Sequence, residues 1–340
     1  MRNYIRYIVS LCLLLTAGCI KKEPIATTPP DSTAASLRSL LTNNFSFSLF
    51  YEAMRRAGVD TLLDNESGGY TIMAPDNGAF GLSGITPDSL QRMNPDDLRK
   101  MVLYHVIPGK ISSTGIPQAL NFPYGTLAHD TLYTSTTALD TNLYVNGIAV
   151  VKKNIYARNG VIHALQYALT IPASSVQTIL EHNPDYSCLV AGLKKFGYWE
   201  ELKTRKPCVI LAPTNEAFAL HNWDVTAIDD MQVADYKKLV FGSYVLSPAF
   251  FFIRDVRMAP PAGPFLKEDV LLSFQTASSG EGIRIKVLPL NYRDPEFSLR
   301  NIFYGDWFDL SYNNPGQLAV NGVVHRVNQL PVIPDSARIR

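Results

Sequence analysis

One decapeptide occurs twice in this chain of 340 residues, and its repetition limits the possible folds more than any other feature. Residues 71–80 read TIMAPDNGAF and residues 209–218 read VILAPTNEAF, with six of the ten positions identical. In each copy an apolar, β-prone run meets a proline, which cannot donate a hydrogen bond to a sheet. Asp76 and Thr214 follow, and such side chains cap the first N–H groups of a helix. Each copy therefore predicts a buried strand that leads directly into a capped helix.

A second motif repeats in the same order further along the chain. Residues 159–163 read NGVIH and residues 321–325 read NGVVH. The decapeptides are offset by 138 residues and the pentapeptides by 162, so the later copy carries about two dozen extra residues between its motifs. Repeats of this length are whole domains in tandem, because solenoid units have periods of roughly 20–50 residues.

The first copy carries three motifs that resemble the sequence marks of the fasciclin-like domain, in that family's order. They are TIMAPDNGAF, then VLYHVIPGK at residues 102–110, then NGVIHALQYAL at residues 159–169. The resemblance spans roughly residues 37–172. The second copy keeps the two outer motifs but reads VFGSYVL at residues 240–246, without the Tyr-His pair of the first copy. We interpret the second copy as a divergent relative of the first.

The resemblance implies both a fold and a class of function. The fasciclin-like fold is α+β, a wedge of short β-strands packed with several helices, so we expect two such domains in tandem. It also implies adhesion or extracellular binding rather than catalysis. Tyr104 and His105 lie in the mark that is associated with cell-surface receptor binding in animal relatives, which makes both candidate interaction residues. The alternative is that this pair belongs to the core and supplies one satisfied polar group.

The first residues of the chain have the pattern of a signal peptide. Residues 1–19 combine two arginines with an apolar stretch, residues 8–15, that is too short to span a membrane as a helix. The sequence LTAGC that ends at Cys19 resembles a lipobox, in which the cysteine becomes the site of lipid attachment, although Thr16 stands where leucine is usual. We expect a lipoprotein anchored in the outer membrane of a Gram-negative bacterium, on its periplasmic or cell-surface face. The alternative is an ordinary secretory signal.

Length and composition then divide the rest of the chain. Residues 20–36 are rich in proline and threonine and predict a flexible tether. The remaining length suits two domains. We place the first fasciclin-like domain at residues 37–172 and a divergent second one at residues 173–335, with an insertion at about residues 250–312. The linker between them is short, which indicates domains held close together.

The chain has no pattern typical of a catalytic or nucleotide-binding site. It lacks the G-x-S-x-G, H-E-x-x-H, P-loop and dinucleotide-binding patterns, and its cysteines lack metal-binding spacing. His105 and His163 could share a zinc ion, but each lies in a family mark where an imidazole is expected to bridge buried backbone groups. Tyr244 replaces His105 in the second copy. We therefore expect no enzymatic activity, no metal and no cofactor, and the net charge of +1 argues against a nucleic-acid partner.

Two cysteines of the second domain leave one structural question open. Cys188 and Cys208 would close a loop of about twenty residues, and such a bridge could stabilise the fold by roughly 3 kcal/mol in an oxidising compartment. However, Cys188 aligns with Leu49, an apolar helix position. A pair of buried free thiols is therefore the alternative to a disulfide.

The insertion in the second domain is rich in aromatic residues. Seven lie between residues 292 and 312, including Tyr304 and Trp307, where the chain-wide share of 11% predicts two or three. Aspartate and glutamate residues lie among them. Aromatic rings beside carboxylates suit sugar binding, but they suit a protein interface or the core of an enlarged domain equally well.

Two functions remain open from the sequence. The leading hypothesis is a non-catalytic envelope lipoprotein that mediates adhesion or binds extracellular protein or matrix. The alternative is a glycan-binding accessory lipoprotein of a polysaccharide-uptake system. Either hypothesis implies a membrane contact through the lipid and a protein or glycan ligand at the cell surface.

Local patterns also predict several elements. Apolar residues at helical spacing precede Gly58 and Gly197, which predicts two helices that end at these glycines. Three Asn-Gly pairs predict type I′ hairpin turns at residues 146–147, 159–160 and 321–322. The run of three phenylalanines at residues 250–252 predicts a buried strand.

Overall fold

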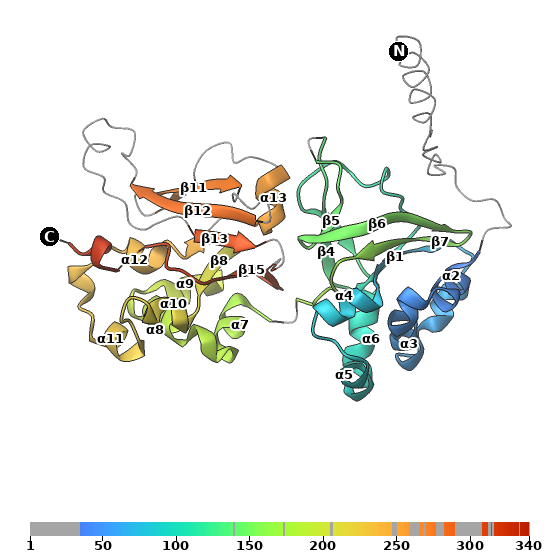
Figure 1. Ribbon diagram of the computed structural model, residues 1–340, viewed down its shortest axis with the longest axis horizontal. Helices are drawn as coiled ribbons and strands as arrows, with labels where there is room; N and C mark the ends of the chain where they lie inside the picture. The colour runs from blue at the N-terminus through green and yellow to red at the C-terminus, as the bar shows by residue number, and fades with distance from the viewer. Residues whose placement is uncertain are drawn as a thin grey trace, which may run out of the picture.

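The chain folds into two units that lie side by side (Figure 1). The computed structural model describes residues 35–138, 140–172, 174–204, 207–246, 250–258, 265–267, 270–276, 282–289, 308–311, 314, 316–332 and 334–339. We call residues 35–172 the N-terminal unit and the described residues from 174 onward the C-terminal unit. Both have the mixed α+β fold predicted from the sequence. The predicted signal peptide and nearly all of the predicted tether lie outside the described residues, as do Cys19, Tyr304 and Trp307.

In the N-terminal unit the helices lie along one side of a sheet with strand order β2-β1-β7-β6-β5-β4-β3 (Figure 1). The helices are α2 (Leu37–Asn43), α3 (Ser48–Arg56), α4 (Asn77–Leu82), α5 (Pro87–Arg92) and α6 (Pro95–Tyr104), with short 3₁₀ turns at Phe45–Phe47 and Asp60–Asp64. The strands are β1 (Tyr70–Pro75), β2 (Val106–Pro108), β3 (Phe122–Gly125), β4 (Thr131–Ser135), β5 (Tyr144–Val145), β6 (Ile148–Ala157) and β7 (Gly160–Leu165).

The C-terminal unit has a sheet of order β14-β15-β8-β9 and a second sheet of order β10-β11-β12-β13. The second sheet lies on the side away from α7, α8 and α11 (Figure 1). The helices are α7 (Val176–His182), α8 (Ser187–Lys195), α9 (Tyr198–Thr204), α10 (Asn215–Ala219), α11 (Val225–Asp230), α12 (Leu239–Gly242) and α13 (Ile253–Met258), with 3₁₀ turns at Pro184–Tyr186, Val233–Asp235 and Pro334–Ala337. The strands are β8 (Cys208–Pro213), β9 (Val245–Leu246), β10 (Phe265–Lys267), β11 (Val270–Thr276), β12 (Gly282–Pro289), β13 (Phe308–Ser311), β14 (Gln317–Ala319) and β15 (Gly322–Val327).

The two repeated sequence motifs become the same pair of parallel strands in each unit. The first half of each decapeptide lies in β1 or β8, and the pentapeptide begins one residue before β7 and β15. β1 pairs with β7 and β8 with β15 in the same register, so that Ile72 faces Ile162 and Ile210 faces Val324. The repetition seen in the sequence therefore reflects a repeated strand pairing, not only a repeated local motif.

Each decapeptide strand runs directly into a capped helix, as predicted. Asp76 Oδ1 accepts a hydrogen bond from the backbone N–H of Ala79 at 2.7 Å, at the start of α4. Thr214 Oγ1 accepts from the N–H of Ala217 at 3.4 Å, at the start of α10. Both caps satisfy a donor that has no partner within its own helix.

A buried asparagine at the start of each pentapeptide joins three parts of its unit. Asn159 Oδ1 accepts from the backbone N–H of Leu37, the first residue of α2, at 2.8 Å. Its Nδ2 donates to the carbonyl oxygens of Leu63 at 2.8 Å and Asn65 at 3.2 Å, which precede β1. One side-chain amide therefore holds the first helix and the approach to the first strand against the start of β7.

The same clamp occurs in the C-terminal unit. Asn321 Oδ1 accepts from the N–H of Val176, the first residue of α7, at 2.9 Å. Its Nδ2 donates to the carbonyl oxygen of Leu202 in α9 at 3.1 Å. We call these two side chains the asparagine clamps.

These positions correct one prediction about the turns. Asn146 and Gly147 have positive φ angles of 48° and 74°, as a type I′ turn requires, and they join β5 to β6. Neither Asn159-Gly160 nor Asn321-Gly322 has a positive φ, so the type I′ prediction is wrong there. Glycine is required for a different reason, because a Cβ on Gly160 would lie 2.3 Å from the carbonyl oxygen of Tyr70.

The two predicted helix ends are confirmed, and the predicted strand at residues 250–252 is not. α3 and α8 end just before Gly58 and Gly197, whose φ angles of 63° and 83° place them in the left-handed region. The predicted strand at residues 250–252 is wrong: these residues form the irregular lead into α13. Phe251 and Phe252 are nevertheless buried, so the apolar run reports burial but not strand geometry.

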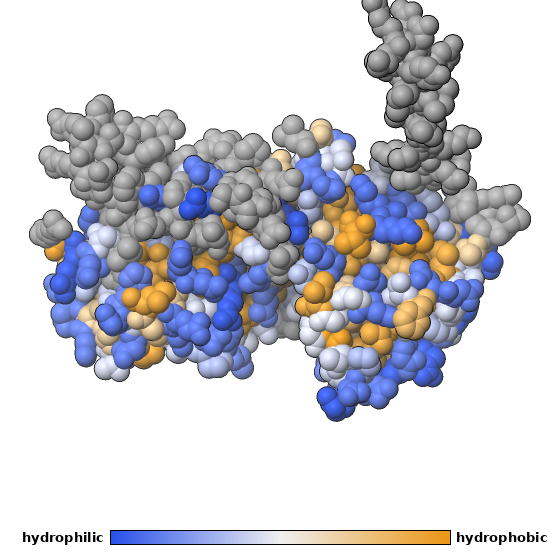
Figure 2. Space-filling model, in the orientation of Figure 1, coloured by the Kyte–Doolittle hydropathy of each residue, from blue (hydrophilic) through white to orange (hydrophobic). Residues whose placement is uncertain are grey.

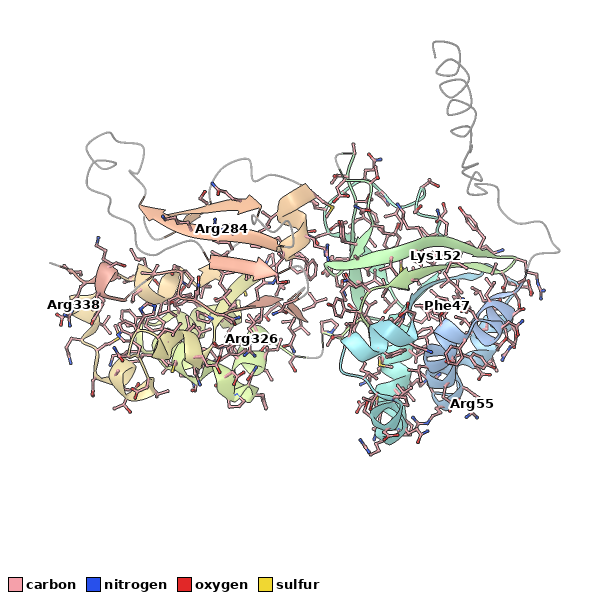
Figure 3. The ribbon with its side chains drawn as sticks, in the orientation of Figure 1. Phe47, Arg55, Lys152, Arg284, Arg326 and Arg338 are labelled. Carbon is pink, nitrogen blue, oxygen red and sulfur yellow. The ribbon has the colours of Figure 1, made fainter. Side chains whose placement is uncertain are left out.

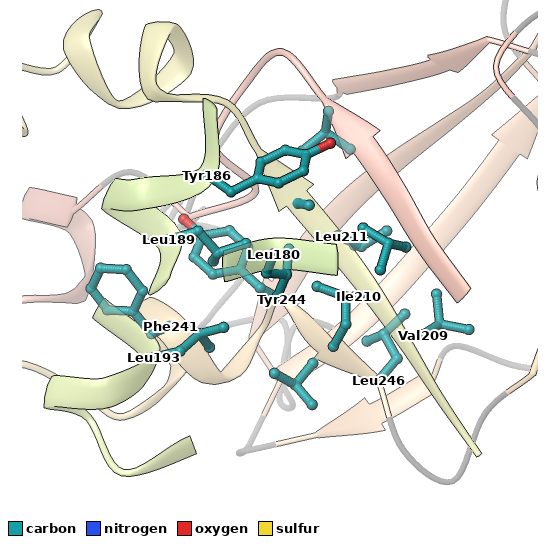
Figure 4. Packing of buried hydrophobic residues seen from close by; sticks show 14 of the residues in the cluster. Leu180, Tyr186, Leu189, Leu193, Val209, Ile210, Leu211, Phe241, Tyr244 and Leu246 are labelled. Carbon is teal, nitrogen blue, oxygen red and sulfur yellow. The ribbon is translucent and has the colours of Figure 1, made fainter. Parts of the chain in front are cut away.

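The core of each unit lies between its helices and its parallel strands. In the C-terminal unit Leu189 and Leu193 of α8, Ile210 of β8 and the ring of Tyr244 belong to one buried cluster (Figure 4). In the N-terminal unit Phe47 is buried among the helices, whereas charged side chains such as Arg55 lie at the periphery (Figure 3). No helix in the described part of the chain is long and apolar enough to cross a membrane.

The asparagine clamp of the N-terminal unit can be tested by Asn159→Ala. The substitution leaves the buried N–H of Leu37 and the buried carbonyl of Leu63 without their partner, and each such group costs about 1–3 kcal/mol. We expect the free energy of unfolding to fall by roughly 2–5 kcal/mol in urea titrations followed by circular dichroism. Asn142→Ala, on the exposed surface, is the control. A loss below about 0.5 kcal/mol, the range of ordinary surface changes, would show that the clamp is not required.

Candidate functional site

The Tyr-His pair expected from the resemblance lies at the end of α6. Tyr104 is the last residue of the helix and His105 caps it, and both side chains are fully buried. The hydroxyl of Tyr104 donates to the carbonyl oxygen of Thr131 at 2.9 Å and accepts from Nδ2 of Asn146 at 2.9 Å. These bonds tie α6 to β4 and to the turn between β5 and β6.

Both ring nitrogens of His105 bind backbone groups. Nδ1 lies 2.7 Å from the carbonyl oxygen of Met101, and Nε2 accepts from the N–H of Leu169 at 2.9 Å. The first contact requires a proton on Nδ1 and the second requires a lone pair on Nε2, so the ring is neutral. Burial lowers the pKa of His105 to about 4, because the protein interior disfavours the charged imidazole.

His163 has the same role on β7. Its Nδ1 accepts from the backbone N–H of Asn154 at 3.3 Å, and its Nε2 lies 3.0 Å from the carbonyl oxygen of Ile111. Burial lowers its pKa as well, so this ring is also held neutral. The bridging of buried backbone groups that the sequence predicted for both histidines is present.

The C-terminal unit keeps one of these two histidine positions. His325, the counterpart of His163 on β15, places Nε2 3.1 Å from the carbonyl oxygen of Phe251, and burial lowers its pKa to about 4. Tyr244 occupies the position of His105. The carbonyl oxygen of Tyr244 accepts a hydrogen bond from the N–H of Leu211 at 2.9 Å. In the N-terminal unit the carbonyl oxygen of His105 accepts the equivalent bond from Met73 at 2.8 Å. A tyrosine ring therefore fills this site without the imidazole bridge.

Of the two interpretations of Tyr104 and His105 from the sequence, this geometry favours core residues with satisfied polar groups over direct contact with a partner. Neither side chain has exposed surface, and their polar atoms already bind groups of the same unit. Any contribution of this pair to binding is indirect, through the position of α6 and the loops that it holds. Within the described residues no three histidine, cysteine, aspartate or glutamate side chains are close enough together to hold a metal ion.

No disulfide joins the two cysteines of the C-terminal unit, Cys188 and Cys208. Both are buried. Cys188 lies on α8 with its Sγ 3.9 Å from the carbonyl oxygen of Trp223, and Cys208 begins β8 with its Sγ 3.6 Å from that of Asn321. Each thiol is directed at a different part of the core, which is why the loop between them is not bridged.

The two units meet along a seam that the sequence did not reveal. Asn121 Nδ2 of the N-terminal unit donates to Oδ2 of Asp255 at 2.9 Å, and that oxygen also accepts from the N–H of Phe252 at 2.7 Å. The rings of Tyr133 and Phe250 pack with centroids 4.7 Å apart. Burial raises the pKa of Asp255, because the interior disfavours its negative charge.

A cation and a glycine extend the same seam. The guanidinium of Arg254 lies over the ring of Tyr144 at 5.3 Å and donates to Oε1 of Gln166 at 3.3 Å. Gly147 packs so closely against Phe252 that a Cβ would lie 2.6 Å from the ring-bearing carbon. Polar, aromatic and close-packed contacts therefore hold the two units together, in addition to the short linker between them.

The described surface has one depression at the seam and another apart from it. One lies between the units, with a volume of about 370 Å³, and is lined from the N-terminal unit by residues including Ile148 and Tyr167 and from the C-terminal unit by residues including Gln317. We call it the interunit cleft; Figure 2 shows the surface indented where the helical sides of the two units meet. The other, of about 830 Å³, is an open groove beside α7, α8 and α11. The predicted aromatic site with Tyr304 and Trp307 lies outside the described residues.

Comparisons with known proteins agree with the resemblance noted in the sequence. Residues 45–172 match the family model of the Fasciclin domain. A protein of Synechocystis sp., named Protein sll1483, is 29% identical over 154 residues, which are 45% of this chain and 82% of that protein. The transforming growth factor-beta-induced protein ig-h3 of Sus scrofa is 26% identical over 219 residues, 60% of this chain but 31% of that protein, so the chain spans about a third of its length.

A plant protein and a solved structure are also similar to this chain. Fasciclin-like arabinogalactan protein 12 of Arabidopsis thaliana is 26% identical over 128 residues, 36% of this chain and 50% of that protein. Among solved structures, the FAS1 domain pair from the insect cell adhesion molecule Fasciclin I aligns with 87% of this chain and 99% of its own, at 16% identity and a TM-score of 0.38.

The neutral histidines make the stability of the fold depend on pH. A histidine whose pKa falls from 6.5 to about 4 on folding binds fewer protons in the folded than in the unfolded state between these values. Its contribution is therefore complete above about pH 6.5 and is lost as the pH falls towards 4. For His105 the loss is on the order of 3 kcal/mol.

We expect His105→Gln to flatten this pH dependence, since glutamine does not titrate. The measurement is the free energy of unfolding between pH 7.5 and about 4 by urea titration. Gln91→Ala, at an exposed position whose side chain does not titrate, should keep the wild-type slope. Identical slopes for wild type and His105→Gln would contradict the neutral, buried assignment.

Proposed function

We propose that this protein is a non-catalytic lipoprotein of the cell envelope that mediates adhesion, or binds extracellular protein or matrix, through its paired fasciclin-like units. The observation that carries the proposal is that two histidine side chains, which could act as bases in an enzyme, are bonded to the backbone instead. In the marks that resemble the family, His105 and His163 bind backbone groups through both nitrogens. Imidazoles committed in this way brace the fold and present no free base to a substrate.

The similarity to the Fasciclin domain supports the same function. Residues 45–172 match that family, and the resemblance implies adhesion or extracellular binding. The relatives come from a bacterium, an animal and a plant, and the names of the animal and plant proteins describe no reaction. These similarities support a binding role.

The seam between the units suits a binding protein. Contacts such as Asn121–Asp255 and Tyr133–Phe250 hold the two units in one arrangement. A ligand that touches both units then meets a surface that is already ordered, so less conformational entropy is lost on binding. A pair of independently moving domains would not have this advantage.

Membrane attachment through Cys19 is part of the proposal. Its support is the pattern of residues 1–19: two arginines, a short apolar stretch and the small residues before the cysteine. A lipid anchor followed by a flexible tether would present both units away from the membrane surface. The alternative, a glycan-binding accessory protein, relied on the aromatic residues around Tyr304 and Trp307.

The adhesive function predicts a specific outcome with coated beads. Beads that carry the chain from residue 20 onward should adhere to surfaces coated with extracellular-matrix proteins such as collagen, fibronectin or laminin. We expect retention at least about fivefold above albumin-coated beads, a difference of roughly 1 kcal/mol in effective affinity. Beads carrying the heat-unfolded chain are the control, since exposed apolar surface alone could cause adsorption. Equal retention of folded protein and albumin on every surface would contradict adhesion to these proteins.

Anchoring is tested separately by Cys19→Ala in the producing bacterium. We expect the wild-type protein in the membrane pellet and the variant in the soluble fraction, because an acyl anchor contributes about 0.8 kcal/mol for each buried methylene group. Cys12→Ala, a change within the predicted signal peptide that leaves the lipobox intact, is the matched control. Wild-type protein that is soluble, with a free N-terminus at residues 20–24, would overturn the anchor.

A further inference from the structure

The described residues that line the interunit cleft carry no charge. Of its eleven described lining residues none is aspartate, glutamate, lysine, arginine or histidine, although 18% of the whole chain is charged. Its volume of about 370 Å³ lies within the range of small-ligand sites, roughly 300–1,000 Å³, and such sites are frequent between domains. A phosphate or carboxylate ligand would require arginine or lysine, and a cation would require acidic groups. The cleft therefore suits an uncharged ligand.

Polar groups line the cleft from both units. Tyr167 and Thr170, which carry hydroxyls, line it from the N-terminal unit, and Asn314 and Gln317, which carry side-chain amides, line it from the C-terminal unit. None of these four makes a side-chain hydrogen bond with the part of the chain that the structure describes. In contrast, the amide of Asn146 deeper in the cleft is already bonded to Tyr104 and Tyr133. The four outer groups can thus both donate to and accept from a bound molecule.

Apolar surface completes the lining. The ring of Tyr167 is partly buried, Ile148 is nearly buried, and Leu82 at the end of α4 keeps 63% of its surface exposed. Hydroxyls and amides beside an aromatic ring match a molecule that has hydroxyl groups along its edges and C–H groups on its faces. A sugar ring has this distribution.

We infer that the interunit cleft binds an uncharged, hydroxyl-rich ligand, namely a segment of a neutral saccharide. Tyr167 packs against the face of a sugar ring, and Thr170, Asn314 and Gln317 bind its hydroxyl groups. The inference rests on the proposed function as an extracellular binding protein and names a ligand class for one of its surfaces.

The cleft depends on the seam between the units. Its inner wall includes Asn146, in the turn that joins β5 to β6, and the next residue, Gly147, packs directly against Phe252 of the C-terminal unit. A ligand that contacts both units is bound only while this contact holds them together. Binding should therefore also stabilise the paired arrangement, since a ligand stabilises the state that binds it.

Isothermal titration calorimetry with the chain from residue 20 onward tests the inference. The neutral probes are cellohexaose, maltohexaose, laminarihexaose and mannohexaose. The comparison probes are heparin and polygalacturonate, which are anionic, and an uncharged Gly-Ser peptide. We expect at least one neutral oligosaccharide to bind with a Kd below about 1 mM, and the anionic probes and the peptide to bind at least about tenfold more weakly.

Variants then place the binding in the cleft. Tyr167→Ala and Gln317→Ala should each weaken the neutral probe about fivefold or more, because they remove the ring face and one amide. Their matched controls, Tyr156→Ala on β6 and Gln91→Ala on α5, lie outside the cleft and should stay within about twofold of wild type. If Tyr167→Ala fails to fold by circular dichroism, Thr170→Val and Gln317→Ala at exposed positions provide the test.

Several outcomes would overturn the inference. These are binding of no neutral probe, preference for the anionic probes or the peptide, or neutral binding that the cleft variants leave unchanged. The bead assay separates this failure from that of the proposed function. Adhesion without saccharide binding would reject the cleft as a sugar site and leave adhesion intact. Saccharide binding without adhesion to any matrix protein would reject protein adhesion and keep the cleft.

Discussion

The asparagine clamps are the interactions on which both units depend. A parallel strand pair needs a connection that leaves one strand and returns to the other, and in each unit that connection contains helices and further strands. The side-chain amides of Asn159 and Asn321 bind the first helix and the segment before the first strand at the point where the second strand begins. A carbonyl and an NH₂ on one short, buried side chain can satisfy backbone donors and acceptors that no strand or helix satisfies.

The histidines of the fasciclin-like marks follow the same physical rule. Loops that cover a core carry backbone groups that need partners, and a neutral imidazole supplies one donor and one acceptor at a fixed separation. His105 joins α6 to the segment after β7, and His163 joins β6 to the segment after β2, and burial keeps both rings uncharged. The two histidines in the motifs that resemble the fasciclin-like domain therefore hold the fold of the N-terminal unit.

The two units share their central strands and helix caps and differ mainly in the parts that contact each other. Each keeps the parallel pair, the caps and the clamp, but the C-terminal unit adds α13 and a second sheet. α13 and the residues before it supply Phe250, Phe252 and Asp255 to the seam. Residues that have no counterpart among the repeated motifs therefore make the contact that holds the two units in one arrangement. Function can change in this way on a duplicated scaffold because the core stays constant.

The sequence by itself determined the elements whose causes are local. The strand that leads into a capped helix, the helix ends at Gly58 and Gly197, and the turn at Asn146-Gly147 follow from backbone chemistry within a few residues. Only the tertiary structure decided the rest. Gly160 is needed because the carbonyl oxygen of Tyr70 approaches it closely. The thiols of Cys188 and Cys208 face different parts of the core. Asn121 donates a hydrogen bond to Asp255 across the seam. These outcomes depend on contacts between residues far apart in the chain, which neither periodicity nor spacing encodes.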